Sequence, residues 1–227
     1  MLDITVKNLE NSVAKVFAAG VSIASTVASD LSSVWTAHSG DFKSNGAGGV
    51  YPTTGKFSGQ LISIDNNLGS KANQDIHWTW VPQADPKLTG GNGWSTMVAG
   101  KIRNAQYAEC VFAVFDTASG SGGEIYLVEN DAPGAFRRES THSSYITSLT
   151  VPIACVLSIR AGVATLTCTG GVTFSTTLTL SITAGGFGGI GLMAYSPAGG
   201  VDATNGVHTG PITGSNYTAA ATAYSII

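Results

Sequence analysis

The sequence has few charged residues for its length. Only 11% of the 227 residues are Asp, Glu, Lys or Arg, whereas an ordinary soluble domain carries about 25%. The net charge is −3, and no basic cluster is larger than the pair Arg137–Arg138. A surface that follows nucleic-acid phosphates needs many clustered Lys and Arg residues. The composition therefore argues against nucleic acid as a partner.

Long apolar runs are also absent. Lys, Ser, Thr or Gly interrupts each apolar stretch after a few residues, and none approaches the roughly 18 residues that a membrane span requires. The N-terminus opens with Met1-Leu2-Asp3 and continues without the basic and apolar regions of a secretory signal. We therefore expect no membrane partner and no Sec-dependent export.

Proline is scarce, with 7 residues, but glycine is abundant, with 29, and 43% of the chain is hydrophobic. Disordered and low-complexity chains lack this much apolar material. A chain of this length can bury well over half of its unfolded surface. The sequence therefore predicts one large domain, or one domain with a short additional arm.

Apolar residues alternate with polar ones along most of the chain, which is the period of a β-strand and not of a helix. Glycine-rich turns separate the alternating segments. Many short strands, such turns and little charge predict an all-β, two-sheet antiparallel sandwich. The expected strands are 60–64, 75–81, 96–102, 107–116, 124–129, 154–160, 163–168, 172–180, 189–195 and 218–227.

The first 24 residues are predicted to form an N-terminal arm, followed by the sandwich domain at 25–227. Leu9, Val13 and Phe17 recur at the spacing of a helix, and Gly20 is placed to end it. The alternative is a strand over 13–17. In either form, we expect the arm to serve assembly.

One hairpin can be placed in register from the sequence. If Ala161-Gly162 is a two-residue loop, Arg160 pairs with Val163 and Cys155 lies opposite Cys168. That pair falls at a non-hydrogen-bonded site, where Cα atoms are about 4.5 Å apart, a distance that a disulfide can bridge. Because no export signal is present, buried free thiols are favoured over a disulfide.

The order of these segments resembles the concanavalin A-like jelly-roll sandwich, the laminin-G-like lectin and glucanase fold. The resemblance implies a two-sheet sandwich, and the fold is known from lectins, glycosidases, adhesion modules and virion parts, so it does not select one function. It covers most of the chain from residue 25 onward and rests on the segments 28–35, 38–42, 75–81, 107–116, 123–129, 157–160, 164–168 and 188–194.

The resemblance also raises the question of glucanase activity. Retaining glucanases of this fold carry a Glu-x-Asp-x-x-Glu strand motif, and the corresponding segment here runs from Glu124 to Glu129 with Tyr126 in place of the central Asp. Retaining chemistry requires both carboxyl groups on one face, about 5–5.5 Å apart. A spacing of five sends these two to opposite faces unless a bulge intervenes. We therefore expect no catalytic residues and no enzyme.

Metal and cofactor sites have equally weak signals. Asp65-Asn66-Asn67 and Asp202-Ala203-Thr204-Asn205 offer oxygen ligands for calcium, but Asx residues in turns usually bond their own backbone. The 3 cysteines lack the Cys-x-x-Cys spacing of a zinc site. The prediction is no metal and no cofactor.

Carbohydrate binding has more support, because sugars stack on aromatic rings and bond polar groups at loop tips. Trp78 and Trp80 share one face of one strand, Trp94 follows in the next loop, and Tyr107 and Tyr126 belong to the neighbouring hairpin. These five aromatic residues are the candidate glycan-binding residues. The alternative for Trp78 and Trp80 is that they fill the core.

The scarcity of charge also bears on assembly. The strand that contains residues 110–115 is apolar on both faces, so it needs cover from the opposite sheet and from a second source, such as loops, the arm or another subunit. Such composition is similar to that of bacteriophage structural proteins. The main prediction is therefore a non-catalytic, homo-oligomeric virion component, for decoration, tail or fibre, contacting other virion proteins and located in a virion assembled in the host cytoplasm. The alternative is a lectin-like module that binds surface glycans.

Overall fold

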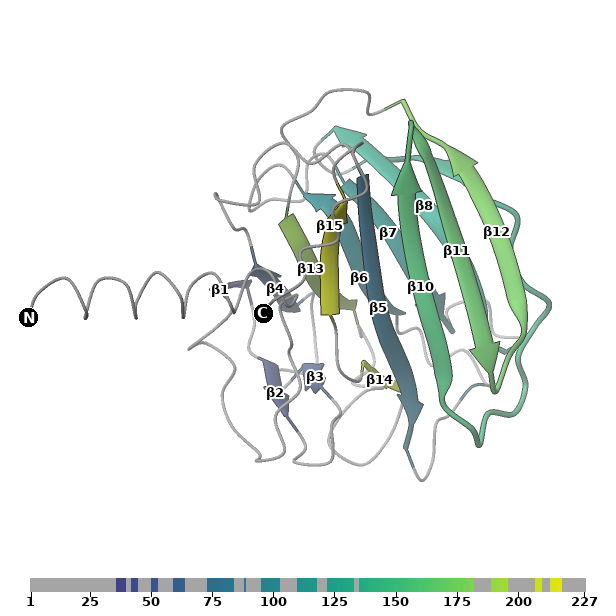
Figure 1. The fold of residues 1–227 in the computed structure, drawn as a ribbon. Helices are drawn as coiled ribbons and strands as arrows, with labels where there is room; N and C mark the ends of the chain where they lie inside the picture. The colour runs from purple at the N-terminus through teal and green to yellow at the C-terminus, as the bar shows by residue number, and fades with distance from the viewer. Residues whose placement is uncertain are drawn as a thin grey trace, which may run out of the picture.

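The structure is a computed structural model of the 227-residue chain. It describes residues 36–39, 42–44, 50–52, 59–63, 73–83, 88, 95–102, 110–117, 122–132, 135–181, 189–195, 207–209 and 213–217. Within these ranges every regular element is a β-strand. The part of the chain described therefore confirms the predicted all-β, two-sheet antiparallel sandwich (Figure 1).

The first layer is a seven-stranded antiparallel sheet with the order β1-β4-β13-β6-β7-β8-β9. Its central strands β6, β7 and β8 pair without any register shift between them, which keeps their side-chain alternation in phase. The strands are β1 (Thr36–Ser39), β4 (Gly59–Ser63), β13 (Gly189–Tyr195), β6 (Ser95–Ile102), β7 (Cys110–Asp116), β8 (Glu124–Ala132) and β9 (Ala135–Glu139).

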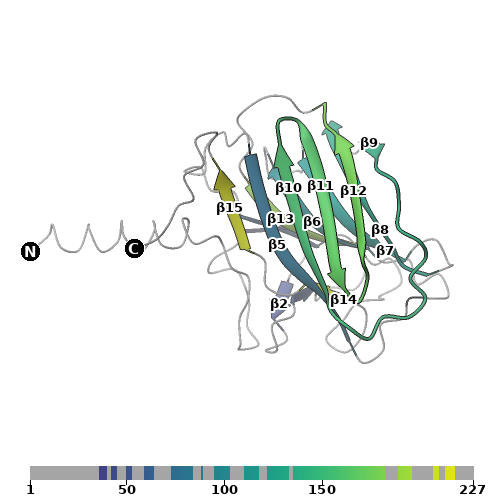
Figure 2. The ribbon, with the colours of Figure 1, turned by 45° about the vertical axis from the view of Figure 1, so that its right-hand side comes forward.

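The second layer is an eight-stranded antiparallel sheet with the order β12-β11-β10-β5-β14-β3-β2, in which β15 also pairs with β5. Figures 1 and 2 show β5, β10, β11 and β12 lying across β6, β7 and β8 of the other layer. The strands are β12 (Phe174–Thr179), β11 (Val163–Gly170), β10 (Ile153–Arg160), β5 (Asn73–Pro82), β14 (Val207–Thr209), β3 (Val50–Pro52), β2 (Phe42–Ser44) and β15 (Thr213–Tyr217).

The main core lies between the two sheets. Strands β5, β10 and β11 contribute Ile76, Trp80, Leu157 and Leu166, which are completely buried. Phe115 on β7 contacts Trp80 edge to face, with the ring centroids 5.4 Å apart. Such aromatic pairs add to the hydrophobic free energy of burial. The apolar alternation of these strands is therefore what holds the two sheets together.

A second apolar cluster lies on the outer face of the seven-stranded sheet. It consists of Met97, Ala99, Cys110, Phe112, Val114 and Val128, all buried. Strand β7 is thus covered on both faces, as the sequence predicted. The homo-oligomer that the sequence analysis expected stays a prediction.

The hairpin of β10 and β11 has the predicted register. Arg160 pairs with Val163, and Cys155 with Cys168. Ala161 has φ 47° and Gly162 has φ 78°, the two left-handed residues that a two-residue type I′ loop requires. The turn therefore fixes which side chains of the two strands face the core and which face outward.

The segment 140–146, here called the serine segment, continues along β8 beyond β9. Ser140 and Ser143 donate their backbone N–H groups to the carbonyls of Leu127 and Ile125, both at 2.9 Å. Their side-chain hydroxyls accept the N–H groups of the same two residues, at 2.9 and 3.0 Å. Ile146 then bonds Gly123 in both directions and enters the core. Hydroxyl groups thus take the place of the carbonyls that a regular strand would supply.

Some predictions lie outside the described residues: the arm at 1–24 with its helix, and the strand at 218–227. The sequence did not predict the short strands β1, β2, β3 and β14, nor β9 and β15. No helix in the described part of the chain is long and apolar enough to cross a membrane.

Candidate functional site: a hollow on the outer face of the eight-stranded sheet

An open hollow of about 340 Å³ lies on the outer face of β5, β10 and β11. Its side chains come from two rows that cross these strands. In the order β5, β10, β11, one row is His77, Val156 and Thr167. The other row is Thr79, Ala154 and Thr169. Trp78 and Cys155 also border the hollow, although their side chains belong to the core. The lining is hydroxyl-rich, with two small apolar side chains on its central strand.

The hollow forms because of the residue sizes on the central strand. Ala154 lies directly between Thr79 on β5 and Thr169 on β11, so a methyl group stands between two longer side chains. Outward-facing side chains of neighbouring strands are about 5 Å apart, and the small residue leaves space at the middle of the row. Ala154 is itself exposed, so the floor of the hollow is open to solvent.

A polar network borders the hollow in the next row. The Asp75 carboxylate accepts hydrogen bonds from the Ser158 hydroxyl at 2.6 Å and from the Arg160 guanidinium at 2.5 Å. Asp75 is largely buried, with 12% of its side chain exposed, whereas Arg160 is 45% exposed. The network holds the outer ends of β5 and β10 together, and its two charges neutralise each other. The rim on this side is therefore polar but carries no net charge.

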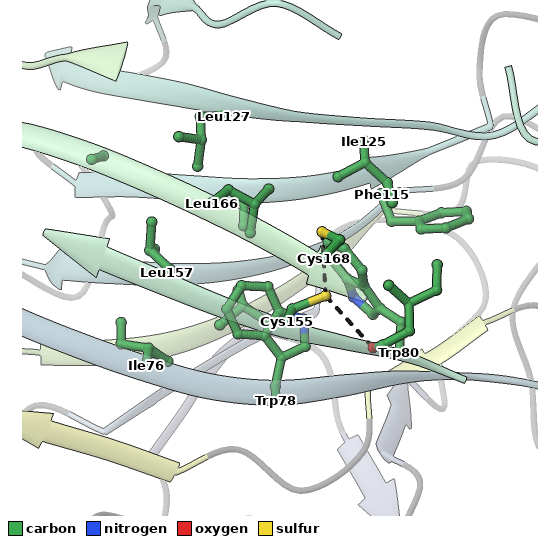
Figure 3. Packing of buried hydrophobic residues seen from close by; sticks show 14 of the residues in the cluster. Ile76, Trp78, Trp80, Phe115, Ile125, Leu127, Cys155, Leu157, Leu166 and Cys168 are labelled. Atoms are coloured by element: carbon green, nitrogen blue, oxygen red, sulfur yellow. Dashed lines mark hydrogen bonds between the residues drawn. The ribbon is translucent and has the colours of Figure 1, made fainter. Parts of the chain in front are cut away.

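The structure places Trp78 and Trp80 in the core and not at a binding surface (Figure 3). They are 3% and 0% exposed, and their rings are in edge-to-face contact with centroids 5.3 Å apart. Even positions of β5 face inward, which buries both rings between the sheets. Both residues therefore fill the core, which is the alternative that the sequence left open. Neither ring has a face accessible to a sugar, so Trp78 and Trp80 are withdrawn as glycan-binding candidates.

Tyr126 lies on the other sheet, on its outer face, and its ring is stacked on the imidazole of His142 with centroids 4.0 Å apart. Its hydroxyl donates a hydrogen bond to Asp116 at 3.2 Å. Burial, and then the Asp116 carboxylate, raise the pKa of Tyr126 well above its ordinary value. His142 is within 3.4 Å of Glu124 and 3.3 Å of Glu139. One face of the Tyr126 ring is therefore occupied by the protein itself.

The structure does not bring the described members of the predicted aromatic site together. Trp78 and Trp80 are inside the sandwich, and Tyr126 is on the far side of the opposite sheet. Trp94 and Tyr107 lie outside the residues whose side chains the structure describes, so their role stays a prediction.

The two acids of the glucanase-like segment lie on opposite faces of β8. Glu124 contacts His142 on the outer face, whereas Glu129 is fully buried and accepts the backbone N–H of Ser181 at 2.6 Å. The pairing of β7 with β8 has no bulge that would bring them to one face. This arrangement does not support retaining glucanase chemistry. The residues described contain no group of three or more His, Cys, Asp or Glu side chains that would hold a metal ion.

The sequence did not predict the hollow, although part of the pattern that forms it was present. The hairpin register already placed Ala154 opposite Thr169, and Val156 opposite Thr167, on the outer face. What the sequence did not show was that β5 lies beside β10 and adds His77 and Thr79.

The fold is shared with a solved carbohydrate recognition domain. The metal-free carbohydrate recognition domain of Emp46p matches with a TM-score of 0.51 and 13% identity, over 80% of this chain and 88% of that domain. This chain has the sandwich fold of that domain. A point mutant of the same domain gives a TM-score of 0.50 at 16% identity, over the same shares of both chains.

A toad ovary galectin in complex with thio-digalactose gives a TM-score of 0.41 and 11% identity, over 68% of this chain and 97% of that one. No family model matches the sequence, and no curated protein matches it. The likeness to the Emp46p domain confirms the predicted concanavalin A-like sandwich fold. The comparisons contain nothing that indicates a bacteriophage origin.

Proposed function

We propose that the protein is a glycan-binding module, and that a small neutral sugar binds in the hollow on β5, β10 and β11. The observation that carries the proposal is the lining of the hollow, which combines two apolar side chains with hydroxyl groups and one exposed imidazole. The likeness of the fold to a carbohydrate recognition domain supports it by analogy only, because one fold serves many functions.

The volume of the hollow suits a small ligand. At about 340 Å³ it lies near the lower end of small-molecule sites, which span roughly 300–1,000 Å³. The side chains of Ala154 and Val156 offer apolar contact for the C–H groups of a sugar ring. The hydroxyls of Thr79, Thr167 and Thr169 can each donate one hydrogen bond and accept two, which matches the donor and acceptor character of sugar hydroxyls.

The charge distribution favours a neutral sugar over an acidic or basic one. Among the residues that the structure describes, no Asp, Glu, Lys or Arg side chain lines the hollow. The neighbouring Asp75 and Arg160 are paired with each other. A charged ligand would lose hydration without meeting an opposite charge that is free to compensate it. A neutral sugar loses less on entering such a site.

The test is retention on columns that carry immobilised mannose, galactose or N-acetylglucosamine, with the variant Ala154→Leu. The larger side chain fills the middle of the hollow, and because position 154 is exposed the core is not disturbed. We expect the parent protein to be retained on at least one column and Ala154→Leu to elute in the void. Thr177→Leu is the matched control, because Thr177 is also exposed, on the outward face of β12, but lies outside the hollow.

A second variant measures the hydroxyl contribution. Thr167→Val keeps the shape of the side chain and removes its hydrogen bond, which contributes about 1 kcal/mol and corresponds to roughly fivefold weaker binding. Retention of Ala154→Leu equal to that of the parent, or passage of the parent through all three columns, contradicts the proposal.

The virion component remains a prediction from composition, together with its location and its virion partners. Neither the fold nor the comparisons support it. The absolute mass of the full chain in solution is the measurement that addresses the predicted homo-oligomer.

A further inference from the structure

Two thiols face each other across the hairpin of β10 and β11, directly beneath the hollow. The sulfur atoms of Cys155 and Cys168 are 3.7 Å apart, and both side chains are in the reduced form (Figure 3). Cys155 lies between Ala154 and Val156 on β10, so the residues on either side of it line the hollow from the opposite face of the strand.

The geometry of the pair is that of a cross-strand disulfide site. Arg160 and Val163 close the two-residue loop, so they form a hydrogen-bonded pair, and the pairs alternate from there. Cys155 and Cys168, five pairs further on, form a non-hydrogen-bonded pair, in which Cα atoms are about 4.5 Å apart. Disulfides span Cα distances of about 4.4–6.8 Å. Rotation of the two side chains is enough to bring the sulfurs to bonding distance.

We propose that Cys155 and Cys168 are the reduced form of a reversible redox pair that closes into a disulfide and locks the hairpin of β10 and β11. The oxidant is a small disulfide such as oxidised glutathione. The thiolate of one cysteine attacks it, which forms a mixed disulfide and releases one glutathione thiolate. The second cysteine thiolate then attacks the protein sulfur of the mixed disulfide and releases the other glutathione. Two protein thiols are oxidised, two glutathione thiols form, and the two protons pass from the former to the latter.

The surroundings of the thiols determine how the bridge forms. The residues are 2% and 0% exposed, and burial raises the pKa of the Cys155 thiol. Since the thiolate is the reactive species, bridging of the folded protein is slow and proceeds when the hairpin opens locally. During folding, when the thiols are accessible, it proceeds faster.

Cys110 provides an internal reference. It is buried in the second apolar cluster, on the outer face of the other sheet, and the β7 and β8 layer separates it from the pair. The expected product therefore contains one disulfide and one remaining thiol. The inference does not depend on the proposed glycan site, because it rests on the register and the sulfur positions alone.

The experiment refolds the full chain in buffers with increasing ratios of oxidised to reduced glutathione, and in parallel incubates the folded chain in the same buffers. Each sample is quenched with acid, denatured, alkylated and measured by intact mass and peptide mapping. We expect the number of alkylated cysteines to fall from three to one as the buffer becomes oxidising, with Cys155 linked to Cys168. Three alkylated cysteines throughout, glutathione adducts, or a bridge to Cys110 overturns the proposal.

A composition-matched variant tests the register. Leu166→Cys combined with Cys168→Leu moves one thiol by two residues along the same face, to a diagonal position about 7–8 Å from Cys155. We expect this variant to keep its thiols or acquire glutathione adducts in buffers that bridge the parent. If it bridges as readily as the parent, pairing does not depend on the register and the proposal is wrong. Circular dichroism reports whether the variant folds. If the variant does not fold, the result for the parent chain alone decides the proposal.

Discussion

Replacing Trp80 with phenylalanine tests how the buried indole groups are accommodated. Trp80 is 0% exposed and packs against Trp78 and Phe115. Its indole N–H has no hydrogen-bond partner in the structure. A buried donor without a partner retains the cost of its lost hydration, roughly 1–3 kcal/mol. Phenylalanine keeps an aromatic ring at this position and removes the donor.

Two opposing terms set the expected change. Phenylalanine buries on the order of 50 Å² less than tryptophan, and with the small cavity this costs about 1–2 kcal/mol. Removing the indole N–H, which has no hydrogen-bond partner, avoids the cost of its lost hydration and stabilises the fold by roughly 1–3 kcal/mol. We therefore expect Trp80→Phe to lower the free energy of unfolding by no more than about 1 kcal/mol. Trp80→Ala, which leaves a large cavity, should cost about 3–5 kcal/mol.

The assay is urea denaturation followed by circular dichroism, with the melting temperature as a second readout. A change of 1 kcal/mol shifts the melting temperature by about 2–4 °C in a domain of this size. Phe115→Leu is the control, because it removes part of an aromatic ring in the same cluster without removing a polar group, and it should cost about 1–2 kcal/mol. A cost above about 3 kcal/mol for Trp80→Phe would refute the reasoning, since it would mean that the indole N–H is bonded in solution.

Three further predictions concern other parts of the fold. Tyr126→Phe removes the hydrogen bond to Asp116 and should cost about 1 kcal/mol at neutral pH. Because the pKa of Tyr126 is raised in the fold, its neutral form contributes stability that is complete below the ordinary tyrosine pKa near 10 and is lost as the pH rises toward the folded value. The variant should therefore lose less stability than the parent above about pH 10 in denaturation curves. Arg138→Ala removes the guanidinium 3.8 Å from the buried Glu129 carboxylate. Because Arg138 is half exposed, the cost in urea denaturation should be only about 1 kcal/mol, and no measurable cost would show that the pair is screened by solvent. Gly170→Ala places a methyl carbon 2.5 Å from a backbone carbonyl oxygen at φ +98°, so a melting temperature within about 2 °C of the parent would contradict the structure there.

The sequence was sufficient for the local features of the fold. The two-residue loop at Ala161-Gly162 determines the register of its hairpin, because each later pair follows from the first. The alternation along β7 likewise showed that both of its faces are apolar. These features depend on residues close together in the chain, where the backbone geometry permits one arrangement.

The sequence was not sufficient for features that join distant segments. The hollow requires β5 beside β10, a pairing of residues about 80 positions apart, and alternation alone does not identify the partner of a strand. For the same reason Trp78 and Trp80 were open to two interpretations. Alternation put both on one face of β5, but only the position of the opposite sheet shows that this face is the inner one.

For Tyr126, the sequence did not show which side chain lies against its ring. The sequence suggested that Tyr126 approaches a glycan site from the hairpin next to Trp78 and Trp80, and its role in such a site stays a prediction. His142, 16 positions later, occupies one face of the ring because the serine segment returns along β8. Nothing in the alternation of the sequence predicts such a return, since the segment has neither strand nor helix periodicity.

The serine segment has a consequence for aggregation. Sheets that end in unpaired N–H and C=O groups can recruit strands from other molecules. At this edge, the N–H groups of Ile125 and Leu127 are already bonded to serine hydroxyls, and a hydroxyl cannot continue a ladder as a peptide group does. The seven-stranded sheet is therefore closed to growth along this part of β8. If the protein is destabilised by heat or acid, we expect intermolecular sheet formation to begin at another strand.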